Sequence, residues 1–451
     1  MNIIVAGCGR VGYTLADQLS REGNEITVID TNYKALESVT SECDVIGYEG
    51  DCTSFRVLKK IDADKADLLI AATDQDEKNM LACLIARKVG KCRTIARVRS
   101  PQYSEEISYL KEELGLSMSV NPEYAAAAEM VRLIQVPSAF EVDTFAKGNV
   151  NLISFVIPEG SPVSGRAIMD IRQKLGINTL ICVVQRGSKI TIPGGDFVLK
   201  ENDKISVSLS LKDANTVFEA FGVKVKKIRN VLIAGGGTVG YYLASMLLKL
   251  RINVKIIEKD PERCEELSEL LPGAMIINGD ATDTTILNEE SIENMDAVCS
   301  LTNKDEENIL LSLYANRVAK AKLMTRIHRN SYEDIIMDVP VGTIISTKKI
   351  TAEYITRYVR SMQNAFENDV EALYRIMDDK VEALEFKVGQ RTDLAGKKLK
   401  NLSIIPNTLI SAIFRHGQVI RPGGNDEIMA GDSVVVVTTK EGLGKIEDIL
   451  G

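Results

Sequence analysis

Two short glycine-rich segments hold the residues best suited to binding chemistry in this 451-residue sequence. The first is Gly7-Cys8-Gly9-Arg10-Val11-Gly12 and the second is Gly235-Gly236-Gly237-Thr238-Val239-Gly240. Both have the spacing G-x-G-x-x-G, follow a short apolar run and open an amphipathic stretch. In such loops the first glycine makes a tight turn, the second lets backbone N–H groups approach a pyrophosphate, and the third packs helix on strand. The two segments therefore predict phosphate-binding loops at helix N-termini.

A carboxylate stands 23 residues after the first glycine of each loop, Asp30 in one case and Glu258 in the other. An acid at the end of the second strand accepts hydrogen bonds from ribose hydroxyls and repels a 2′-phosphate. The pattern thus favours NAD-type or plain adenosine nucleotides over NADP. The alternative is a glycine-rich turn in a Rossmann-like sheet that binds nothing.

Further polar residues follow the later strands that we expect in the same sheet. In the first half they are Asp51 with Cys52, Thr73-Asp74 and Arg97, and in the second half they are Asp280, Thr302-Asn303 and Arg326. The carboxyl ends of parallel strands form the ligand crevice, and guanidinium groups bind phosphate bidentately, so we expect ligand contacts here. Helix capping by the Asp and Thr residues and solvation of the arginines are the alternatives. The recurrence of these residues in both halves favours ligand contact, although the two copies of a duplicated chain also share folding constraints.

Cys8 lies inside the first loop, at a helix N-terminus that could lower its thiol pKa and make it redox-sensitive. The second loop has Gly236 there, so a passive small side chain is the preferred interpretation. His328 stands where the first half has Arg99, and His416 lies in an expected turn beside Gly417. We expect both histidines to be surface residues.

The chain is an internal duplication. The glycine loops and their acids recur at an offset of 228 residues, and Gly50-Asp51, Asn79 and Arg97 recur at 229. Pro193-Gly194-Gly195 and Asp203 also recur at 229, as Pro422-Gly423-Gly424 and Asp432. Each half therefore contains the same two modules.

The first module alternates apolar runs such as 3–6, 26–29 and 68–72 with longer amphipathic stretches, which predicts a parallel α/β sheet of Rossmann type. The second module, with strands over 189–192 and 204–209 around a Pro-Gly-Gly turn, predicts a small α+β domain. A helix over 123–136 ends the first Rossmann-like domain, and we expect its apolar face to pack against a neighbouring domain. The expected domains are 1–138, 139–224, 229–366 and 367–451.

Composition narrows the functional class. The net charge of −8 disfavours a nucleic-acid footprint, and apolar runs are too short to cross a bilayer. Eight scattered cysteines without a C-x-x-C pair, together with only two histidines, indicate a reducing cytoplasm and no metal site. An NAD-dependent oxidoreductase is the main rival to a binding module, but the crevice shows no convincing acid, base or nucleophile. A nucleotide-sensing transcription regulator would need a basic helix-turn-helix segment, which we do not find.

The first-half residues Gly7 to Gly12, Asp30, Gly50-Asp51, 71–74 with Asn79, and 95–98 resemble the N-domain of regulator-of-K⁺-conductance (RCK) proteins. The module with Pro193-Gly194-Gly195 and Asp203 resembles the matching C-domain. Two such pairs in tandem are similar to the TrkA family, the peripheral regulatory subunits of Trk-type potassium uptake systems. The resemblance implies a cytoplasmic, non-enzymatic gating ring of two or four chains. This ring would bind NAD or NADH, or ATP or ADP, beneath a membrane-embedded potassium-translocating subunit.

The second half departs from the first at three positions of the expected site. Thr238 replaces Arg10, Glu258 replaces Asp30, and Asn303 replaces Asp74. Whether the second site binds the same nucleotide is therefore an open question for the structure.

Overall fold

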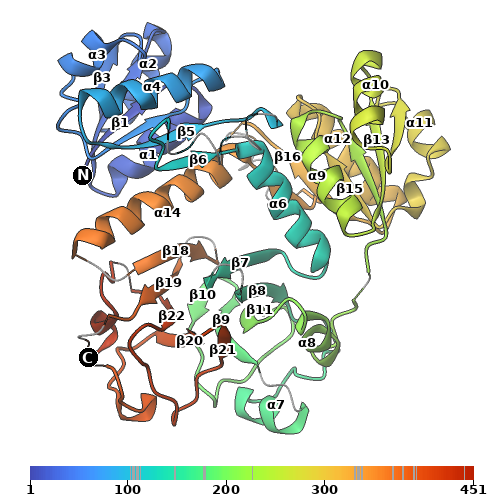
Figure 1. Cartoon of the computed structure of the whole chain (residues 1–451). Coiled ribbons are helices and arrows are strands. Elements are labelled where there is room, and N and C mark those ends of the chain that lie inside the picture. The colour runs from blue at the N-terminus through green and yellow to red at the C-terminus, as the bar shows by residue number, and fades with distance from the viewer. Residues whose placement is uncertain are drawn as a thin grey trace. The chain divides into compact units, whose positions relative to one another are not determined.

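The computed structural model describes the chain except for residues 102, 104–106, 108–110, 112, 147–148, 176–178, 226, 330–331, 333–335, 337–338, 368–369, 378–379, 390–391, 393 and 441. It divides into two compact units, and each unit draws on both halves of the sequence (Figure 1). Unit 1 comprises Met1–Val131 and Ile228–Thr356, and unit 2 comprises Arg132–Lys227 and Arg357–Gly451. Like modules are therefore grouped together, although they are far apart in the sequence.

Unit 1 contains two Rossmann-like domains of the same topology, and the last helix of each runs on past the unit boundary. The elements of the first are β1 (Asn2–Ala6), α1 (Arg10–Arg21), β2 (Glu25–Asp30), α2 (Tyr33–Glu42), β3 (Ile46–Glu49), α3 (Phe55–Lys60), β4 (Leu68–Ala71), α4 (Asp76–Val89), β5 (Arg93–Arg97), β6 (Met118–Val120) and α6 (Pro122–Gln135). Those of the second are β12 (Asn230–Ala234), α9 (Thr238–Lys249), β13 (Asn253–Glu258), α10 (Pro261–Leu270), β14 (Met275–Asn278), α11 (Thr284–Glu289), η2 (Ile292–Asn294), β15 (Ala297–Ser300), α12 (Asp305–Val318), β16 (Lys322–Arg326), β17 (Thr343–Ile345) and α14 (Thr347–Glu367).

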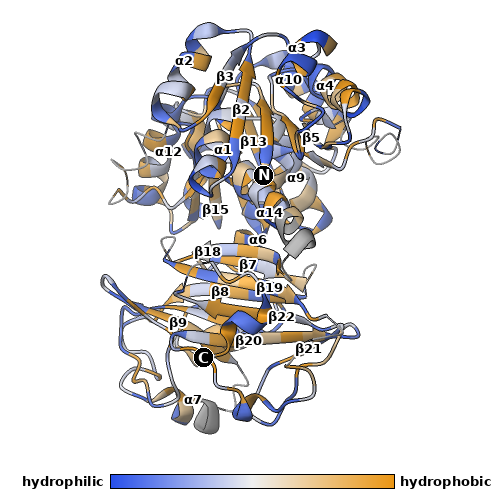
Figure 2. Cartoon of the chain, turned by 90° about the vertical axis from the view of Figure 1, so that its left-hand side faces the viewer, coloured by the Kyte–Doolittle hydropathy of each residue, from blue (hydrophilic) through white to orange (hydrophobic). Residues whose placement is uncertain are grey.

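The two parallel sheets have equivalent strand orders, β3-β2-β1-β4-β5-β6 and β14-β13-β12-β15-β16-β17. The chain reverses direction across the sheet between β1 and β4, and between β12 and β15, which is where Rossmann-like sheets bind ligands. Strand β4 is buried at all four positions, as expected for a strand covered on both faces. Figure 2 shows hydrophobic residues along β2, where Ile26, Val28 and Ile29 are buried.

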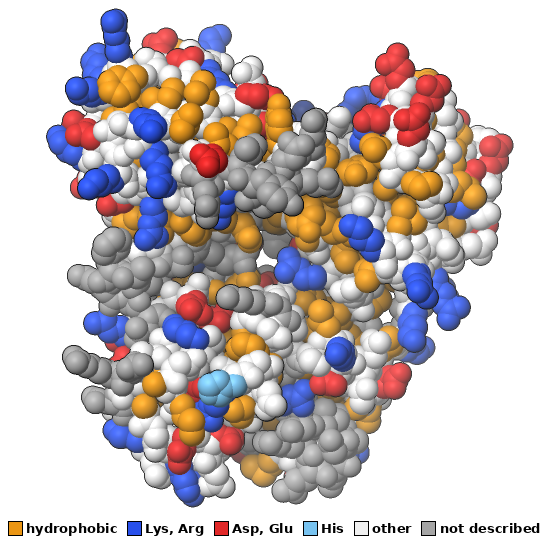
Figure 3. Space-filling model, viewed as in Figure 1, with side chains coloured by type: hydrophobic (Ala, Val, Ile, Leu, Met, Phe, Trp, Pro, Cys, Tyr) orange, Lys and Arg blue, Asp and Glu red, His pale blue; other side chains and the backbone are white. Residues whose placement is uncertain are grey.

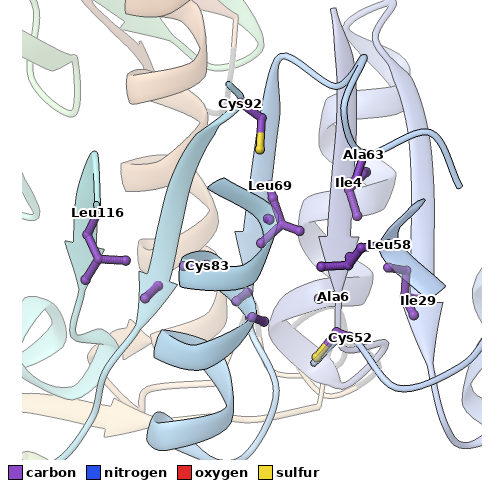
Figure 4. Packing of buried hydrophobic residues seen from close by; sticks show 14 of the residues in the cluster. Ile4, Ala6, Ile29, Cys52, Leu58, Ala63, Leu69, Cys83, Cys92 and Leu116 are labelled. Atoms are coloured by element: carbon purple, nitrogen blue, oxygen red, sulfur yellow. The ribbon is translucent and has the colours of Figure 1, made fainter. Parts of the chain in front are cut away.

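One face of the first sheet packs on a core that includes three cysteines (Figure 4). Cys52, Cys83 and Cys92 lie among Ile4, Leu69 and other side chains of this cluster, and each is at most 4% exposed. These thiols therefore act as small hydrophobic side chains.

The two Rossmann-like domains contact each other within unit 1. The ring of Tyr124, in α6, packs edge-on against that of Tyr242, in α9, with 5.4 Å between centroids. The amide Nδ2 of Asn121 donates a hydrogen bond of 2.9 Å to the Tyr242 hydroxyl. The start of the predicted helix thus packs against a neighbouring domain of the same chain. Ala127, in the same helix, is also fully buried within the chain. Its burial therefore does not indicate a contact between chains of an oligomer.

Unit 2 contains the two small α+β domains, whose sheets are antiparallel and of equal topology. The first has β7 (Glu141–Phe145), β8 (Val150–Val156), α7 (Ile168–Leu175), β9 (Leu180–Arg186), β10 (Lys189–Thr191), β11 (Lys204–Leu209) and α8 (Ala214–Ala220). The second has β18 (Val370–Ile376), β19 (Val381–Lys387), η3 (Leu399–Asn401), β20 (Thr408–Arg415), β21 (Gln418–Ile420), β22 (Ser433–Thr438) and η4 (Ile446–Ile449). Their strand orders are β10-β9-β11-β8-β7 and β21-β20-β22-β19-β18. The predicted fold class, a duplicated pair of Rossmann-like and α+β domains, is therefore confirmed.

One detail differs from the expectation for the Pro-Gly-Gly turn. Strands β10 and β11, which flank it, do not pair with each other, because β9 lies between them in the sheet. A buried acid just before β11 is held by the last residue of β9: the guanidinium of Arg186 binds both oxygens of Asp203 at 2.7 and 2.8 Å. Arg415 and Asp432 repeat this pair in the second domain, at 2.8 Å for both bonds. The recurring aspartate is therefore structural.

Candidate functional site

A cavity of about 630 Å³ opens at the carboxyl ends of the first parallel strands. Nine of the twelve first-half residues predicted for the site line it: Gly7, Gly9, Arg10, Val11, Asp30, Cys52, Thr73, Asp74 and Arg97. The other three, Cys8, Gly12 and Asp51, do not line it. The first-half prediction therefore converges on one cavity.

The glycines of the first loop differ in what their backbone requires. Gly7 has a φ of +100°, a conformation that residues with a Cβ rarely adopt, and its N–H donates to the Ile29 carbonyl at 2.8 Å. A Cβ on Gly12 would lie 1.7 Å from the Gly7 carbonyl oxygen, so glycine is required by contact with the loop itself. A Cβ on Gly9 would meet no atom within 4 Å. Gly9 is the N-cap of α1, so this helix presents its unpaired N–H groups to an open space that suits an anion.

Asp30 holds the glycine loop in place. Its Oδ2 accepts the N–H of Cys8 at 2.6 Å, and its Oδ1 accepts the N–H of Asn32 at 2.8 Å. A carboxylate accepts about four hydrogen bonds, so capacity remains for two ribose hydroxyls. The same carboxylate can therefore both shape the loop and bind a nucleotide.

The thiols of the site are not activated. The Cys8 side chain is buried, and burial together with the nearby charge of Asp30 raises its pKa to about 12. Burial raises the pKa of Cys52 to about 11. Both are neutral thiols near pH 7, which supports the passive interpretation of Cys8 over the redox sensor.

A buried amide accounts for the recurrence of Asn79 and of Thr73, the threonine that it binds. Asn79 Oδ1 accepts from the backbone N–H and the hydroxyl of Thr73, and its Nδ2 donates to the carbonyl of Arg97 at 2.9 Å. Asn308 makes the equivalent bonds to the N–H of Thr302 and the carbonyl of Arg326, both at 2.9 Å. This bridge ties together the ends of two neighbouring strands in each sheet. Folding thus accounts for the recurrence of the asparagine and the threonine, whereas Arg97 and Arg326 contribute only their backbone carbonyls to the bridge.

The two acids that follow the third strands also have a local role. Asp51 Oδ1 accepts from the N–H and the hydroxyl of Thr53, and Asp280 makes the same bonds with Thr282. Hydrogen bonds from the backbone N–H and hydroxyl of those threonines lower the pKa of both acids. Asp51 also lies 3.5 Å from the ammonium of Lys78, which lines the cavity. Lys78 was missed because Glu307 occupies its place in the second half.

A smaller cavity, of about 180 Å³, lies where the two Rossmann-like domains of unit 1 meet. Arginine and lysine side chains from both domains line it, together with one histidine: Arg10, Arg97, Arg99, Arg326, Lys348 and His328. Burial, which outweighs the opposing charge of Glu123, lowers the pKa of both Arg97 and Arg326. Glu123 Oε1 lies 3.9 Å from Arg97 Nη2. The structure thus brings Arg326 of the second half close to Arg10, Arg97 and Arg99, which also line the first cavity, and such a cluster suits phosphate groups.

His328 is not the surface residue that we expected. Its side chain is 14% exposed and its Nδ1 lies 2.7 Å from Asp305 Oδ1. Burial and the charge of Arg326 lower the pKa of the imidazole. His416, in contrast, is exposed as predicted. Among the described residues no group of His, Cys, Asp and Glu side chains is placed to hold a metal ion.

The second glycine loop has the same backbone form. Gly235 has a φ of +105°, Gly237 is the N-cap of α9, with Thr238 and Val239 in its first turn, and a Cβ on Gly240 would lie 2.3 Å from the Gly235 carbonyl oxygen. Glu258 Oε2 accepts the N–H of Gly236 at 2.7 Å, as Asp30 accepts that of Cys8. The backbone alone would therefore suit a nucleotide in either half.

Comparison with known proteins assigns both modules of each half to families. Residues 3–122 and 231–347 match the TrkA-N domain, and residues 152–222 and 383–451 match the TrkA-C domain. The chain is 34% identical over 449 residues to the Trk system potassium uptake protein TrkA homolog of Archaeoglobus fulgidus, with 100% of both chains covered. It is 31% identical to the Trk system potassium uptake protein TrkA of Halomonas elongata, with 97% of this chain and 95% of that one covered.

Solved structures share the fold at lower identity. The GsuK channel bound to NAD superposes with a TM-score of 0.63 at 19% identity, covering 98% of this chain and 77% of that one. The GsuK RCK domain gives a TM-score of 0.63 at 18% identity, covering 98% and 92%. With two N-domains, two C-domains and full-length relatives at more than 30% identity, the chain belongs to the TrkA family of Trk-system potassium uptake proteins.

Proposed function

We propose that this chain is a nucleotide-binding regulatory subunit of a Trk-type potassium uptake system, with its principal NAD or NADH site in the first Rossmann-like domain. The observation that carries the proposal is the cavity in which the α1 N-terminus, Asp30 and Arg97 face the same space. The N-terminus of α1 and the guanidinium of Arg97 can bind the pyrophosphate, and the carboxylate of Asp30 can accept hydrogen bonds from the adenosine ribose. The fold's appearance in a channel solved with NAD supports this ligand class, and ATP or ADP would use the same groups.

The cavity supports regulation better than oxidoreductase chemistry. A dehydrogenase needs a proton donor or acceptor beside the nicotinamide. The described lining of the cavity includes no histidine, and its thiol, Cys52, is neutral near pH 7. Asp30 is engaged by two backbone N–H groups. A ligand that is bound and not converted can still act, provided that its affinity differs between two conformations of the protein.

The partner that fits is a membrane-embedded potassium-translocating subunit. In the part of the chain that the structure describes, no helix combines the length and hydropathy needed to cross a membrane. Figure 3 shows Lys and Arg interspersed with Asp and Glu on the face drawn, where a nucleic-acid-binding protein would present a basic patch. We propose a homo-oligomeric ring at the cytoplasmic side of that subunit, built from four domains over 1–138, 139–224, 229–366 and 367–451.

Two experiments test the function. Calorimetric titration of the full chain with NAD⁺, NADH, ATP and ADP should show binding, and nucleotide should raise the melting temperature as any native-state ligand does. Rubidium uptake by vesicles that hold the membrane subunit should then change with nucleotide only when this chain is present. Substrate-dependent NADH consumption by the purified chain, with hydroxy- or keto-acids, would contradict the regulatory function.

A further inference from the structure

The two glycine loops differ in the side chain that the neighbouring helix, α2 in the first half and α10 in the second, places beside them. Ala35, in the first turn of α2, lines the first cavity. At the repeat offset of 228, the equivalent residue of α10 is Arg263. Its Nε donates a hydrogen bond of 2.8 Å to the carbonyl of Gly236, in the second glycine loop, and its Nη1 lies 2.5 Å from Glu266 Oε2. Where the first half leaves room beside the loop, the second half places an arginine across it.

The packing beneath this arginine is adapted to the same arrangement. A Cβ on Gly236 would lie 2.4 Å from Leu267 Cδ1, whereas the first loop carries Cys8 at this position. Leu267 is fully buried and replaces the smaller Val39 of the first half. The second loop thus has no side chain at this position, and the larger Leu267 of α10 fills the space. This second difference draws the loop and α10 together.

The acid of the second loop also has less capacity for a ligand. Glu258 accepts three backbone N–H groups, from Gly236, Lys259 and Asp260. Asp30 accepts two. With about four acceptor positions per carboxylate, Glu258 retains one for a ribose that offers two hydroxyls.

We propose that Arg263 is a latch that closes the ribose side of the second nucleotide site, so that the resting chain binds NAD at the first site alone. The proposal rests on the nucleotide-binding function proposed above. A dinucleotide entering the second loop must first displace the guanidinium from the Gly236 carbonyl and from Glu266. A hydrogen bond from a charged group is strong enough to lower the apparent affinity of that site by about tenfold or more.

The test is the stoichiometry of NAD binding to the full chain by calorimetry. Wild type should bind one NAD per chain, and Arg263→Ala should bind a second, with an affinity at least about tenfold above the wild-type second site. Glu266→Ala, which frees the guanidinium without removing it, should give a smaller gain. The control Glu262→Ala, on the exposed side of the same helix turn, should still bind one NAD per chain. The mirror variant Ala35→Arg should weaken binding at the first site.

Each contrary result has a defined meaning. Two equivalents in wild type, or a single equivalent in Arg263→Ala with the first site intact, would overturn the latch while leaving the proposed function standing. Two equivalents in wild type that fall to one in Arg263→Ala would show that Arg263 contacts the ligand, which also overturns the latch. No NAD binding by either protein would refute the proposed NAD site, and the latch with it.

Discussion

Replacing Asp30 by asparagine tests the first nucleotide site most directly. The carboxylate accepts the N–H groups of Cys8 and Asn32 at 2.6 and 2.8 Å, one on each oxygen. An asparagine keeps one carbonyl oxygen and turns an NH₂ group towards the second donor. It also removes the charge that we expect to accept the ribose hydroxyls. The variant therefore perturbs both the shape of the loop and the ligand contact.

The expected size of the effect follows from the bonds lost. A hydrogen bond to a charged group contributes about 1.5–3 kcal/mol. With about 1.4 kcal/mol per tenfold change in affinity, Asp30→Asn should weaken NAD binding by roughly 10- to 100-fold. Calorimetry on the full chain measures this directly. A thermal melt of each variant establishes that the change is not caused by unfolding.

Two controls sharpen this prediction. Glu258→Gln makes the same change of charge beside the second loop. It should leave first-site affinity within a factor of about two, because Glu258 bonds only to backbone N–H groups of the second domain. Asp44→Asn removes an exposed carboxylate from the same domain and should have no effect. Unchanged NAD affinity in a folded Asp30→Asn protein, or an equal loss in Glu258→Gln, would refute the assignment of the site.

Three further predictions concern stability. Gly12→Ala places a Cβ 1.7 Å from a backbone carbonyl and should cost about 3 kcal/mol or more, whereas Gly9→Ala, which meets no atom within 4 Å, should melt near the wild-type temperature. Arg415→Met leaves Asp432, 1% exposed, without its cation and should cost about 3–5 kcal/mol by urea denaturation; a loss below 1 kcal/mol would contradict a structural role for the pair. Burial, followed by the charge of Arg326, lowers the pKa of His328 below 6.5, so the unfolded chain takes up a proton that the folded protein excludes. Stability should therefore fall as the pH drops below about 6.5, and His328→Gln should flatten the urea-unfolding pH profile there.

Much of the fold could be predicted because its signals are local. The apolar runs at 3–6, 26–29 and 68–72 became β1, β2 and β4 with ends within one residue, since strands buried on both faces must be apolar throughout. The helix expected over 123–136 runs from Pro122 to Gln135. Strands β7 to β9 were not predicted, although β8 and β9 are buried over most of their length.

The candidate site was only partly accessible to sequence reasoning. Repetition located the residues of the first cavity, because a turn with a positive φ at Gly7 and a close contact at Gly12 demands glycine at fixed spacing. Asp51 does not line this cavity and forms a local turn with Thr53, so its contact with a ligand stays a prediction. Repetition could not find Lys78, whose place in the other half holds an acid.

The sequence by itself determined that two equal halves exist, that each holds a parallel-sheet domain and a small α+β domain, and that each carries a glycine loop with an acid 23 residues later. These features depend on residues near one another in the chain, where backbone geometry limits the choices. Only the tertiary structure decided that the Rossmann-like domains pair with each other, that Arg326 lies beside the first cavity, and that Arg263 crosses the second loop. Such contacts depend on how a long side chain is oriented and on how segments distant in the sequence pack, and neither periodicity nor spacing encodes them.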